Sequence, residues 1–345
     1  MSFLGYKDVI EDGDTVIVFL GHESMMPLKM VLGNTTQTRY GALRHSELIG
    51  KRYGSKVSTL GGKGWVYVLH PTPELWTVNL PHRTQVLYFP DISLLTFELE
   101  LKPGSIVVEA GTGSGSVSHS IARTIAPSGH LYTFEFHEQR AEKASEEFVE
   151  HNLADIVTVT HRDVSTDGFL LDVDYKADAI FLDLPSPWNV IPHAKKVLKT
   201  RGGRICSFSP CIEQVQRACV ELDALGFTDI KTVECLIRNY DVKTINLPLP
   251  NIGEPRNLEG DSKRSHTGSG EPAEKRARTE DNGTKAAKVD NGSDDTSEGS
   301  KEVRRKGKGQ VEDAGKESNY TRKCAVPQRE MPGHTGFLTF ASLYT

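Results

Sequence analysis

The spacing of hydrophobic residues changes along the chain and divides it into zones. Between residues 1 and 75, glycine-containing turns separate short apolar or alternating runs at residues 15–20, 28–32, 56–59 and 65–69. Short strands with closely spaced turns are typical of a small β-barrel or sandwich. We therefore expect a small N-terminal β-domain over residues 1–75.

Beyond residue 75, apolar runs alternate with segments of helical spacing. One helical segment carries Val117, Ile121 and Ile125 at i, i+4 and i+8, and another covers residues 212–222. The apolar runs predict strands at residues 106–109, 130–135, 156–160, 177–183 and 203–209, followed by a long run at 227–246. This alternation predicts an α/β domain over residues 76–250, built on a mostly parallel, doubly wound sheet.

Residues 251–330 differ from the rest in composition. They carry 17 Lys and Arg against 16 Asp and Glu, with almost no large apolar side chains. Such a segment buries too little surface to offset the entropy of ordering, so we expect it to be disordered. Residues 334–343 then resume a strand pattern, and we expect residues 331–345 to return to the sheet. The alternative, a tail ending in an exposed apolar strand, is less favourable.

A glycine-rich turn follows the strand at 106–109. Residues 107–115 read Val-Val-Glu-Ala-Gly-Thr-Gly-Ser-Gly, so that Glu109 precedes glycines at 111, 113 and 115. Glycines let backbone approach a ligand closely, and Ser116 opens a helix whose N-terminus favours electron-rich groups. A dinucleotide fingerprint, Gly-x-Gly-x-x-Gly, requires its third glycine one place later, at Ser116. A dehydrogenase is therefore the least favoured enzyme class.

The next strand ends in an acid, Glu135, which lies 26 residues after Glu109. Doubly wound folds bind ribose hydroxyls with an acid at this position. A solvated charge at a strand end is the alternative interpretation.

Composition limits the other function classes. The 345 residues carry a net charge of −5, so any basic surface for nucleic acid must be local. The five cysteines form no Cys-x-x-Cys pair and have no clustered histidines beside them, which favours reduced thiols inside the cell over zinc or disulfides. We see neither a signal peptide nor an apolar stretch approaching about 18 residues, so we expect a soluble protein without a membrane segment.

Several motifs together carry a family resemblance. The Glu-x-Gly-x-Gly-x-Gly run resembles motif I of class I S-adenosylmethionine (AdoMet) methyltransferases. The run Asp183-Leu-Pro-Ser-Pro-Trp188 is related, but not identical, to the Asp/Asn-Pro-Pro-aromatic motif of methyltransferases that act on amino nitrogens of bases. More specifically, the catalytic subunit of the eukaryotic tRNA adenine-N(1)-methyltransferase is similar at residues 69–76, 79–88, 109–116, 183–188, 207–215 and 334–341. The match covers nearly the whole chain outside the insert.

The resemblance implies a fold and an activity. The fold is a class I methyltransferase domain, Rossmann-like with a seven-stranded sheet, preceded by a small N-terminal β-domain. Its sixth and seventh strands form an antiparallel hairpin, and the 251–330 insert falls inside it. The activity is AdoMet-dependent methylation of ring nitrogen 1 of the T-loop adenine at tRNA position 58. The active form joins this subunit to a related non-catalytic partner, and two such pairs form a heterotetramer. Whether adenines in T-loop-like folds of mRNA are also methylated stays an open question.

The resemblance also assigns site residues. Asp183 reaches the target base, and Tyr88 lies at the mouth of the pocket. The alternatives are that Asp183 caps the proline turn or touches the cofactor amine, and that Tyr88 only packs. Glu135 takes the ribose with Arg140 beside it, Asp163 and Val164 border the adenine ring, and no metal is implied. The methionine end of AdoMet lies against the segment 85–87, which includes Gln85 and Leu87, and against Gly111, Thr112, Gly113, Ser114, Gly115 and Ser116.

A carboxylate suits the chemistry of this reaction. The sulfonium of AdoMet is already a strong electrophile, so the reaction requires no nucleophilic side chain. Attack by ring nitrogen 1 places positive charge on the adenine. A carboxylate that accepts a hydrogen bond from the exocyclic amino group stabilises this charge as it develops.

Binding a T-loop adenine requires the base to be extruded, at a cost of a few kcal/mol. Contacts to phosphates must offset this cost, and each candidate is by itself more often a solvated charge. Two basic clusters, at residues 275–278 and 304–308, resemble nuclear-import signals and predict a nuclear protein. Electrostatic help in holding tRNA is the competing interpretation. The candidates for phosphate contact are Arg39, Arg44, Lys51, Arg52, Lys56, His82 and Arg83.

Two other functions stay open. One is a catalytically silent scaffold that only binds tRNA, although such a subunit has no reason to keep the glycine loop, Glu135 and Asp183 together. The other is a class I methyltransferase that acts on a protein or a small molecule.

Overall fold

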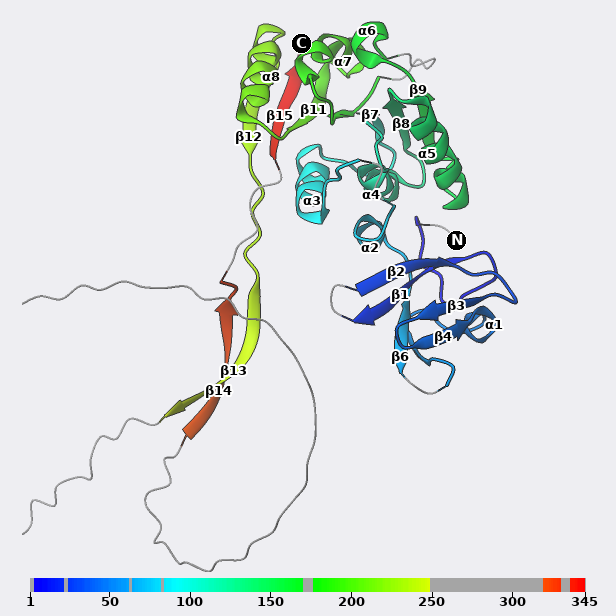
Figure 1. The fold of residues 1–345 in the computed structure, drawn as a ribbon. Helices are drawn as coiled ribbons and strands as arrows, with labels where there is room; N and C mark the ends of the chain where they lie inside the picture. The colour runs from blue at the N-terminus through cyan, green and yellow to red at the C-terminus, as the bar shows by residue number, and fades with distance from the viewer. Residues whose placement is uncertain are drawn as a thin grey trace, which may run out of the picture. The chain divides into compact units, whose positions relative to one another are not determined.

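The computed structural model describes residues 3–21, 24–61, 64–81, 84–169, 176–248, 319–329 and 336–344 (Figure 1). The chain divides into two compact units. One comprises Met1–Asn239 and Gln328–Thr345, and the other comprises Tyr240–Pro327. Of the helices in the described ranges, none is long and apolar enough to span a membrane.

The N-terminal part of the first unit is built on a four-stranded antiparallel sheet in the order β2-β1-β6-β5. Alternate valines of these strands, such as Val16, Val18 and Val66, pack into one core beneath the sheet. β2 begins and ends earlier than the predicted strand at 28–32. The β3–β4 hairpin was not predicted, because its first strand reads Thr-Thr-Gln-Thr and has no apolar alternation. The elements are β1 (Thr15–Gly21), β2 (Ser24–Lys29), β3 (Thr35–Thr38), β4 (Gly41–Arg44), α1 (His45–Leu48), β5 (Ser55–Ser58) and β6 (Trp65–Leu69).

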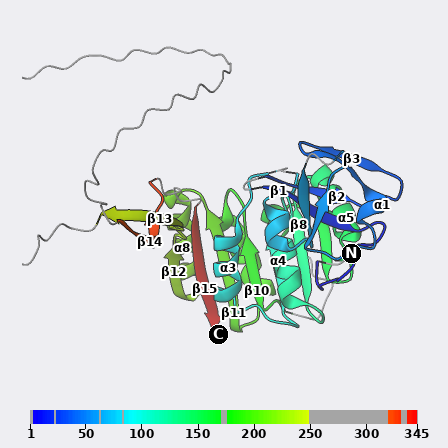
Figure 2. The ribbon, with the colours of Figure 1, turned by 90° about the horizontal axis from the view of Figure 1, so that it is seen from below.

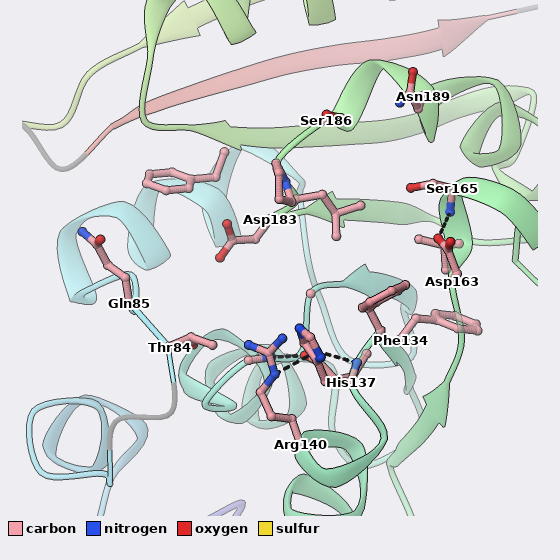
Figure 3. Close-up of a pocket in the computed structure, with 18 of the residues that line it drawn as sticks. Thr84, Gln85, Phe134, His137, Arg140, Asp163, Ser165, Asp183, Ser186 and Asn189 are labelled. Carbon is pink, nitrogen blue, oxygen red and sulfur yellow. Dashed lines mark hydrogen bonds and ion pairs between the residues drawn. The ribbon is translucent and has the colours of Figure 1, made fainter.

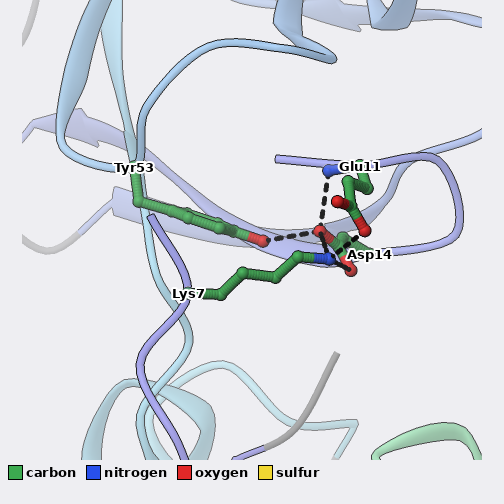
Figure 4. A network of polar contacts seen from close by, with 4 residues as sticks. All are labelled: Lys7, Glu11, Asp14 and Tyr53. Carbon is green, nitrogen blue, oxygen red and sulfur yellow. Dashed lines mark hydrogen bonds and ion pairs between the residues drawn. The ribbon is translucent and has the colours of Figure 1, made fainter. Parts of the chain in front are cut away.

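A buried carboxylate fastens the N-terminal segment to this sheet (Figure 4). Asp14 is 2% exposed and accepts hydrogen bonds from the Lys7 ammonium at 2.9 Å, the Glu11 N–H at 2.7 Å and the Tyr53 hydroxyl at 3.2 Å. Burial alone would raise the pKa of Asp14, but the Glu11 and Lys7 hydrogen bonds outweigh it and lower the pKa. The buried charge is therefore compensated where it lies.

The larger domain, in the same unit, contains a seven-stranded sheet in the order β12-β15-β11-β10-β7-β8-β9. β15 runs antiparallel to β11 and β12, and the other neighbouring strands are parallel. This confirms the predicted doubly wound fold and the return of the last strand to the sheet. The strands are β7 (Ile106–Ala110), β8 (His130–Glu135), β9 (Val157–His161), β10 (Ala179–Leu182), β11 (Arg201–Ser209), β12 (Thr228–Val233) and β15 (Phe337–Tyr344).

Helices cover both faces of the sheet, because its strands are apolar on both sides. Side chains of α3, α4 and α5 pack into the core on one face, and Figure 2 shows α3 and α4 in front of the strands. Side chains of α6, α7 and α8 pack into the core on the other face. The helices are α2 (Pro73–Thr77), α3 (Phe89–Glu98), α4 (Ser116–Ile125), α5 (Glu138–Glu150), α6 (Val164–Asp167), the 3₁₀ helix η1 (Pro187–Asn189), α7 (Ile191–Val197) and α8 (Ile212–Ala224).

The long apolar run at 227–246 is two strands rather than one. β12 belongs to the central sheet, whereas β13 (Tyr240–Pro248) pairs antiparallel with β14 (Asn319–Pro327) in the second unit. β14 lies inside the range 251–330 that we expected to be disordered, so that expectation is wrong for these residues. The charged composition of the whole insert concealed a short segment with Cys324 and Val326 that completes a backbone ladder with β13. Residues 249–318 and 330–335 lie outside the described residues.

Candidate active site

The glycine loop connects β7 to α4 with a backbone that requires glycine. Gly111, Gly113 and Gly115 have φ angles of +98°, +54° and +75°. A Cβ at Gly111 would lie 2.3 Å from the carbonyl oxygen of Asp183, and one at Gly113 would lie 2.8 Å from the Thr84 hydroxyl oxygen. The loop therefore packs closely against the Asp183 backbone and the Thr84 side chain, where no side chain of its own would fit.

Short polar side chains fasten this loop to the protein beneath it. The Thr112 hydroxyl lies 2.7 Å from that of Thr133, and Ser114 accepts the Thr84 N–H at 3.2 Å. Ser116 donates to the carbonyl oxygen of Leu87 at 3.0 Å. All three loop side chains are buried. They hold the loop in shape and are not among the residues that line the cavity described below.

Glu135 connects the end of β8 to the glycine loop. Its carboxylate accepts the Gly113 N–H at 2.9 Å and the His137 N–H at 3.1 Å, and it forms an ion pair with Arg140 at 3.2 Å. A carboxylate offers about four acceptor sites, so capacity for ligand hydroxyls is left over. The geometry fits the predicted ribose role.

A cavity of about 740 Å³ opens above the carboxyl ends of the strands (Figure 3). In Figure 3 the Asp183 carboxylate points into this space, with Gln85 on one side and Arg140 below. Ligands of open α/β sheets bind at this edge. Of the residues assigned from sequence, those that line the cavity are Gln85, Leu87, Gly111, Gly113, Glu135, Arg140, Asp163, Val164 and Asp183.

Asp183 directly follows β10 and is held through its backbone. Its N–H donates to the carbonyl oxygen of Ala110 at 2.9 Å, which continues the pairing of β10 with β7. Burial raises the pKa of the Asp183 carboxyl to about 7, and the negative charge of Glu135 adds to this rise. The side chain is half-buried.

A third acid lies beneath the same loop. Glu109 is 1% exposed and accepts the Ser118 hydroxyl at 2.5 Å. Burial raises its pKa to about 7, against lowering hydrogen bonds from Ser118 and Thr133, and the charges of Asp183 and Glu135 raise it further. Three carboxyl groups thus share a small region, and a cationic ligand would relieve their mutual repulsion. The residues present fit AdoMet, which carries a sulfonium cation.

Asp163 lines one wall of the cavity and is the N-cap residue of α6. Its carboxylate accepts the Ser165 N–H at 2.9 Å and the Thr166 hydroxyl at 2.8 Å, and these bonds, the Thr166 bond first, lower its pKa. Val164 and Phe134 add apolar surface to the same wall. This wall suits a flat heteroaromatic ring with polar edges.

The remaining assigned residues do not line the cavity: Tyr88, Thr112, Ser114, Gly115 and Ser116. Tyr88 is the residue before α3 and is 39% exposed. Their roles toward cofactor or base stay predictions. Sequence reasoning missed other lining residues, although some follow assigned ones directly, such as Phe136 and His137 after Glu135. Val86, within the assigned segment 85–87, lines the cavity as well. The missed residues are Thr84, Phe134, Phe136, His137, Arg162, Ser165, Leu184, Pro185, Ser186, Asn189, Phe208, Pro210 and Gln214.

Two histidines lie buried behind the glycine loop. With Glu147, the ligand atoms of His119 and His151 lie within 4.8 Å of one another, a grouping that could hold an ion. His119 Nδ1 donates to the Gly115 carbonyl at 2.6 Å, and its Nε2 lies 2.8 Å from His151 Nδ1. Two nitrogens about 2.1 Å from one tetrahedral ion would be roughly 3.4 Å apart. The observed pair is therefore hydrogen-bonded.

Comparison with known proteins gives a consistent result. Residues 64–343 match the family model described as tRNA methyltransferase complex GCD14 subunit. The tRNA (adenine(58)-N(1))-methyltransferase catalytic subunit of Candida albicans is 40% identical over 346 residues, 99% of this chain and 98% of that protein. The protein of the same description from Dictyostelium discoideum is 48% identical over 254 residues, 73% of this chain and 81% of that protein.

Solved structures agree on the fold. An AdoMet-dependent O-methyltransferase from Thermotoga maritima superimposes with a TM-score of 0.67 at 24% identity, covering 98% of this chain and 96% of that one. The tRNA (m1A58) methyltransferase of Aquifex aeolicus has a TM-score of 0.61 at 19% identity, covering 98% of this chain and 100% of that one. At these identities the likeness establishes the class I methyltransferase fold alone.

Proposed function

Because this chain belongs to the family of tRNA methyltransferase complex GCD14 subunits, we propose that it methylates ring nitrogen 1 of adenine 58 of tRNA. It is an AdoMet-dependent methyltransferase. The observation that supports the proposal most is that Gly111 and Gly113 of the glycine loop, Glu135 and Asp183 all line the same cavity.

Each part of the cavity has a task in this proposal. AdoMet supplies an activated methyl group when bound. The bare backbone of Gly111 and Gly113 admits its methionine end, Glu135 accepts its ribose hydroxyls, and the wall of Phe134 and Val164 packs against its adenine ring.

Asp183 takes the catalytic role toward the base. Its carboxylate accepts a hydrogen bond from the exocyclic amino group of the extruded adenine, and this bond strengthens as the ring becomes cationic. Losing a preorganised group of this kind costs about 2.7–4 kcal/mol. With a pKa of about 7, Asp183 is only partly ionised in the free protein, and a cationic ligand nearby shifts it to the carboxylate.

Tyr88 and the basic residues serve the RNA. We propose that the partly exposed Tyr88 ring packs against the extruded base. Among the cations predicted to hold phosphates, Arg44 lies 3.7 Å from Glu47 and Lys56 lies over the Trp65 ring at 3.8 Å, so part of their capacity is used within the protein. Lys51 and Arg52 are exposed. Residues 82 and 83 lie outside the described residues.

A related non-catalytic subunit completes the proposed enzyme, as a heterotetramer of two pairs. Because this chain has a net charge of −5, we propose that a partner subunit supplies much of the positive surface that binds tRNA. The β13–β14 hairpin, two-stranded within the described residues, exposes 75% of Val242. Such a hairpin is marginal alone and suits burial against another chain. Mass photometry of the co-expressed subunits tests the assembly, and a monomer would contradict it.

The central experiment is methylation of transcript tRNA with and without the partner, followed by mass-spectrometric mapping of the modified base. We expect one methyl group on adenine 58. If the purified complex binds AdoMet in calorimetry but modifies only protein or small molecules, the RNA assignment is wrong. If it binds no AdoMet at high concentration, the silent scaffold is correct. Transcripts with T-loop-like folds from mRNA test the wider substrate range.

Nuclear residence is proposed from the basic clusters at 275–278 and 304–308, which lie outside the described residues. Deleting residues 255–315 removes both clusters and leaves β14 intact. We expect lost nuclear accumulation with unchanged activity in vitro. Unchanged localisation, or weakened tRNA binding alone, would favour an electrostatic role instead.

A further inference from the structure

The loop after Asp183 has few backbone donors with which to hold its own shape. Prolines at 185 and 187 have no N–H. At its start, the loop is fastened by the Asp183 N–H, which donates to Ala110 at 2.9 Å. From Ser186 on, the loop holds itself through two backbone bonds, from Asn189 to Ser186 at 3.2 Å and from Val190 to Pro187 at 2.9 Å. The carbonyl oxygen of Pro185 is held by a side chain from another element.

Gln214, in the first turn of α8, supplies that side chain. Its side-chain oxygen accepts the Cys211 N–H at 3.1 Å, as part of the helix cap, and its side-chain nitrogen donates to the carbonyl oxygen of Pro185 at 2.9 Å. One amide group thus ties the start of α8 to the middle of the loop. Gln214 is half-buried and lines the cavity together with Pro185.

A second contact follows on the same face of α8. Arg217, three residues further on, places its guanidinium carbon 5.0 Å from the centroid of the Trp188 ring. Residues at i and i+3 of a helix are neighbours, so α8 contacts the loop at Pro185 and again at Trp188. The loop is held at both sides of Ser186.

The hydrogen bond from Gln214 to Pro185 affects the position of the loop more than the stability of the fold. Pro185 is exposed, so water can replace a lost donor there. Removing the bond should leave the fold intact while freeing the loop whose first residue is Asp183. A shift of about 1 Å at a reacting geometry can cost about 100-fold in rate.

We propose that Gln214 is a positioning residue for methyl transfer, which holds the loop between Asp183 and Trp188 so that the Asp183 carboxylate meets the substrate base. Gln214 acts through Pro185, whereas Asp183 touches the base. The inference rests on the function proposed above.

The test compares variants of the full chain co-expressed with its partner subunit. Gln214→Glu keeps an oxygen that accepts the Cys211 N–H and replaces the NH2 donor to Pro185 with a second oxygen. Gln214→Met removes both hydrogen bonds with a side chain of similar size. Gln216→Glu makes the same charge change on an exposed part of α8 and is the matched control. We expect kcat to fall roughly 10- to 100-fold in both Gln214 variants, with the KM for AdoMet and the melting temperature unchanged. The control should match wild type.

A double variant with Asp183→Asn provides the decisive arm. If Gln214 acts through Asp183, adding Gln214→Glu to Asp183→Asn should cost less than about threefold more. The same loss in both backgrounds, or Gln214 variants with wild-type kcat, would overturn the inference. If the wild-type complex itself leaves adenine 58 unmodified, the proposed function fails instead, and the two failures are distinct.

Discussion

Replacing Asp183 by asparagine preserves the size of the side chain, yet it should lower methyl transfer to tRNA by about 100- to 1,000-fold. The amide cannot supply the negative charge that steadies the cationic adenine. Its one amide oxygen can still accept a hydrogen bond from the exocyclic amino group, but this neutral bond is weaker than one to a carboxylate. The corresponding loss of transition-state stabilisation is about 2.7–4 kcal/mol.

Stability should change in the opposite direction. Burial and the neighbouring Glu135 raise the pKa of Asp183 to about 7, so the folded protein holds the ionised carboxylate at a cost. The neutral amide removes that repulsion. The backbone bond from residue 183 to Ala110 is unaffected by the substitution. We therefore expect the melting temperature without ligand at pH 8 to be equal to or higher than that of wild type.

Single-turnover transfer of labelled methyl from saturating AdoMet to transcript tRNA measures the chemical step. Asp223→Asn, the same change on the exposed end of α8, is the matched control and should retain full activity. Activity of Asp183→Asn within about threefold of wild type would refute the catalytic role. A large loss accompanied by a large fall in melting temperature would show that the substitution acts on the fold.

Three further substitutions test the cofactor half of the site. Glu135→Gln removes the carboxylate that we propose accepts the ribose hydroxyls of AdoMet. The Kd for AdoMet, measured by calorimetry, should rise by about 10- to 100-fold, and an unchanged Kd would contradict the ribose role. Gly111→Ala places a Cβ 2.3 Å from the Asp183 carbonyl oxygen, and the backbone φ at residue 111 is +98°. The substitution should therefore abolish AdoMet binding. A Kd for AdoMet within about threefold of wild type would refute the close packing. Glu109 has a folded pKa of about 7 against an ordinary 4.5, so wild type loses stability as pH rises between these values. In urea unfolding, Glu109→Gln should therefore gain about 3 kcal/mol over wild type from pH 4.5 to 8, and a gain independent of pH would contradict the raised pKa.

Local patterns were sufficient to predict the framework of the larger domain. Alternating helical and strand periods predicted the sheet, and the glycine run predicted a turn that three positive φ angles require. The acid at the end of the next strand, Glu135, lies against that turn as the spacing indicated. These features depend on residues close in sequence, which is why a single chain reveals them.

Features that depend on distant residues were not predictable. Thr112 and Ser116 belong to the glycine motif, yet their hydroxyls bond to Thr133 and Leu87 beneath the loop, because only the packed fold decides which side of a turn faces the cavity. Gln214 lies in a stretch that the resemblance covers, but its bond to Pro185 joins elements far apart in the chain. Nothing local in the charged insert distinguished β14, whose pairing partner is β13.

The most direct test of the account measures whether Asp183 recognises the exocyclic amino group. Wild type and Asp183→Asn would each be given transcripts carrying adenine or purine, which lacks that group, at position 58. Intrinsic differences in reactivity between the two bases cancel in the comparison. The quantity compared is the ratio of the methylation rate on adenine to the rate on purine. The account predicts that this ratio is at least about 100-fold larger for wild type than for Asp183→Asn. An equal preference in both enzymes would contradict it.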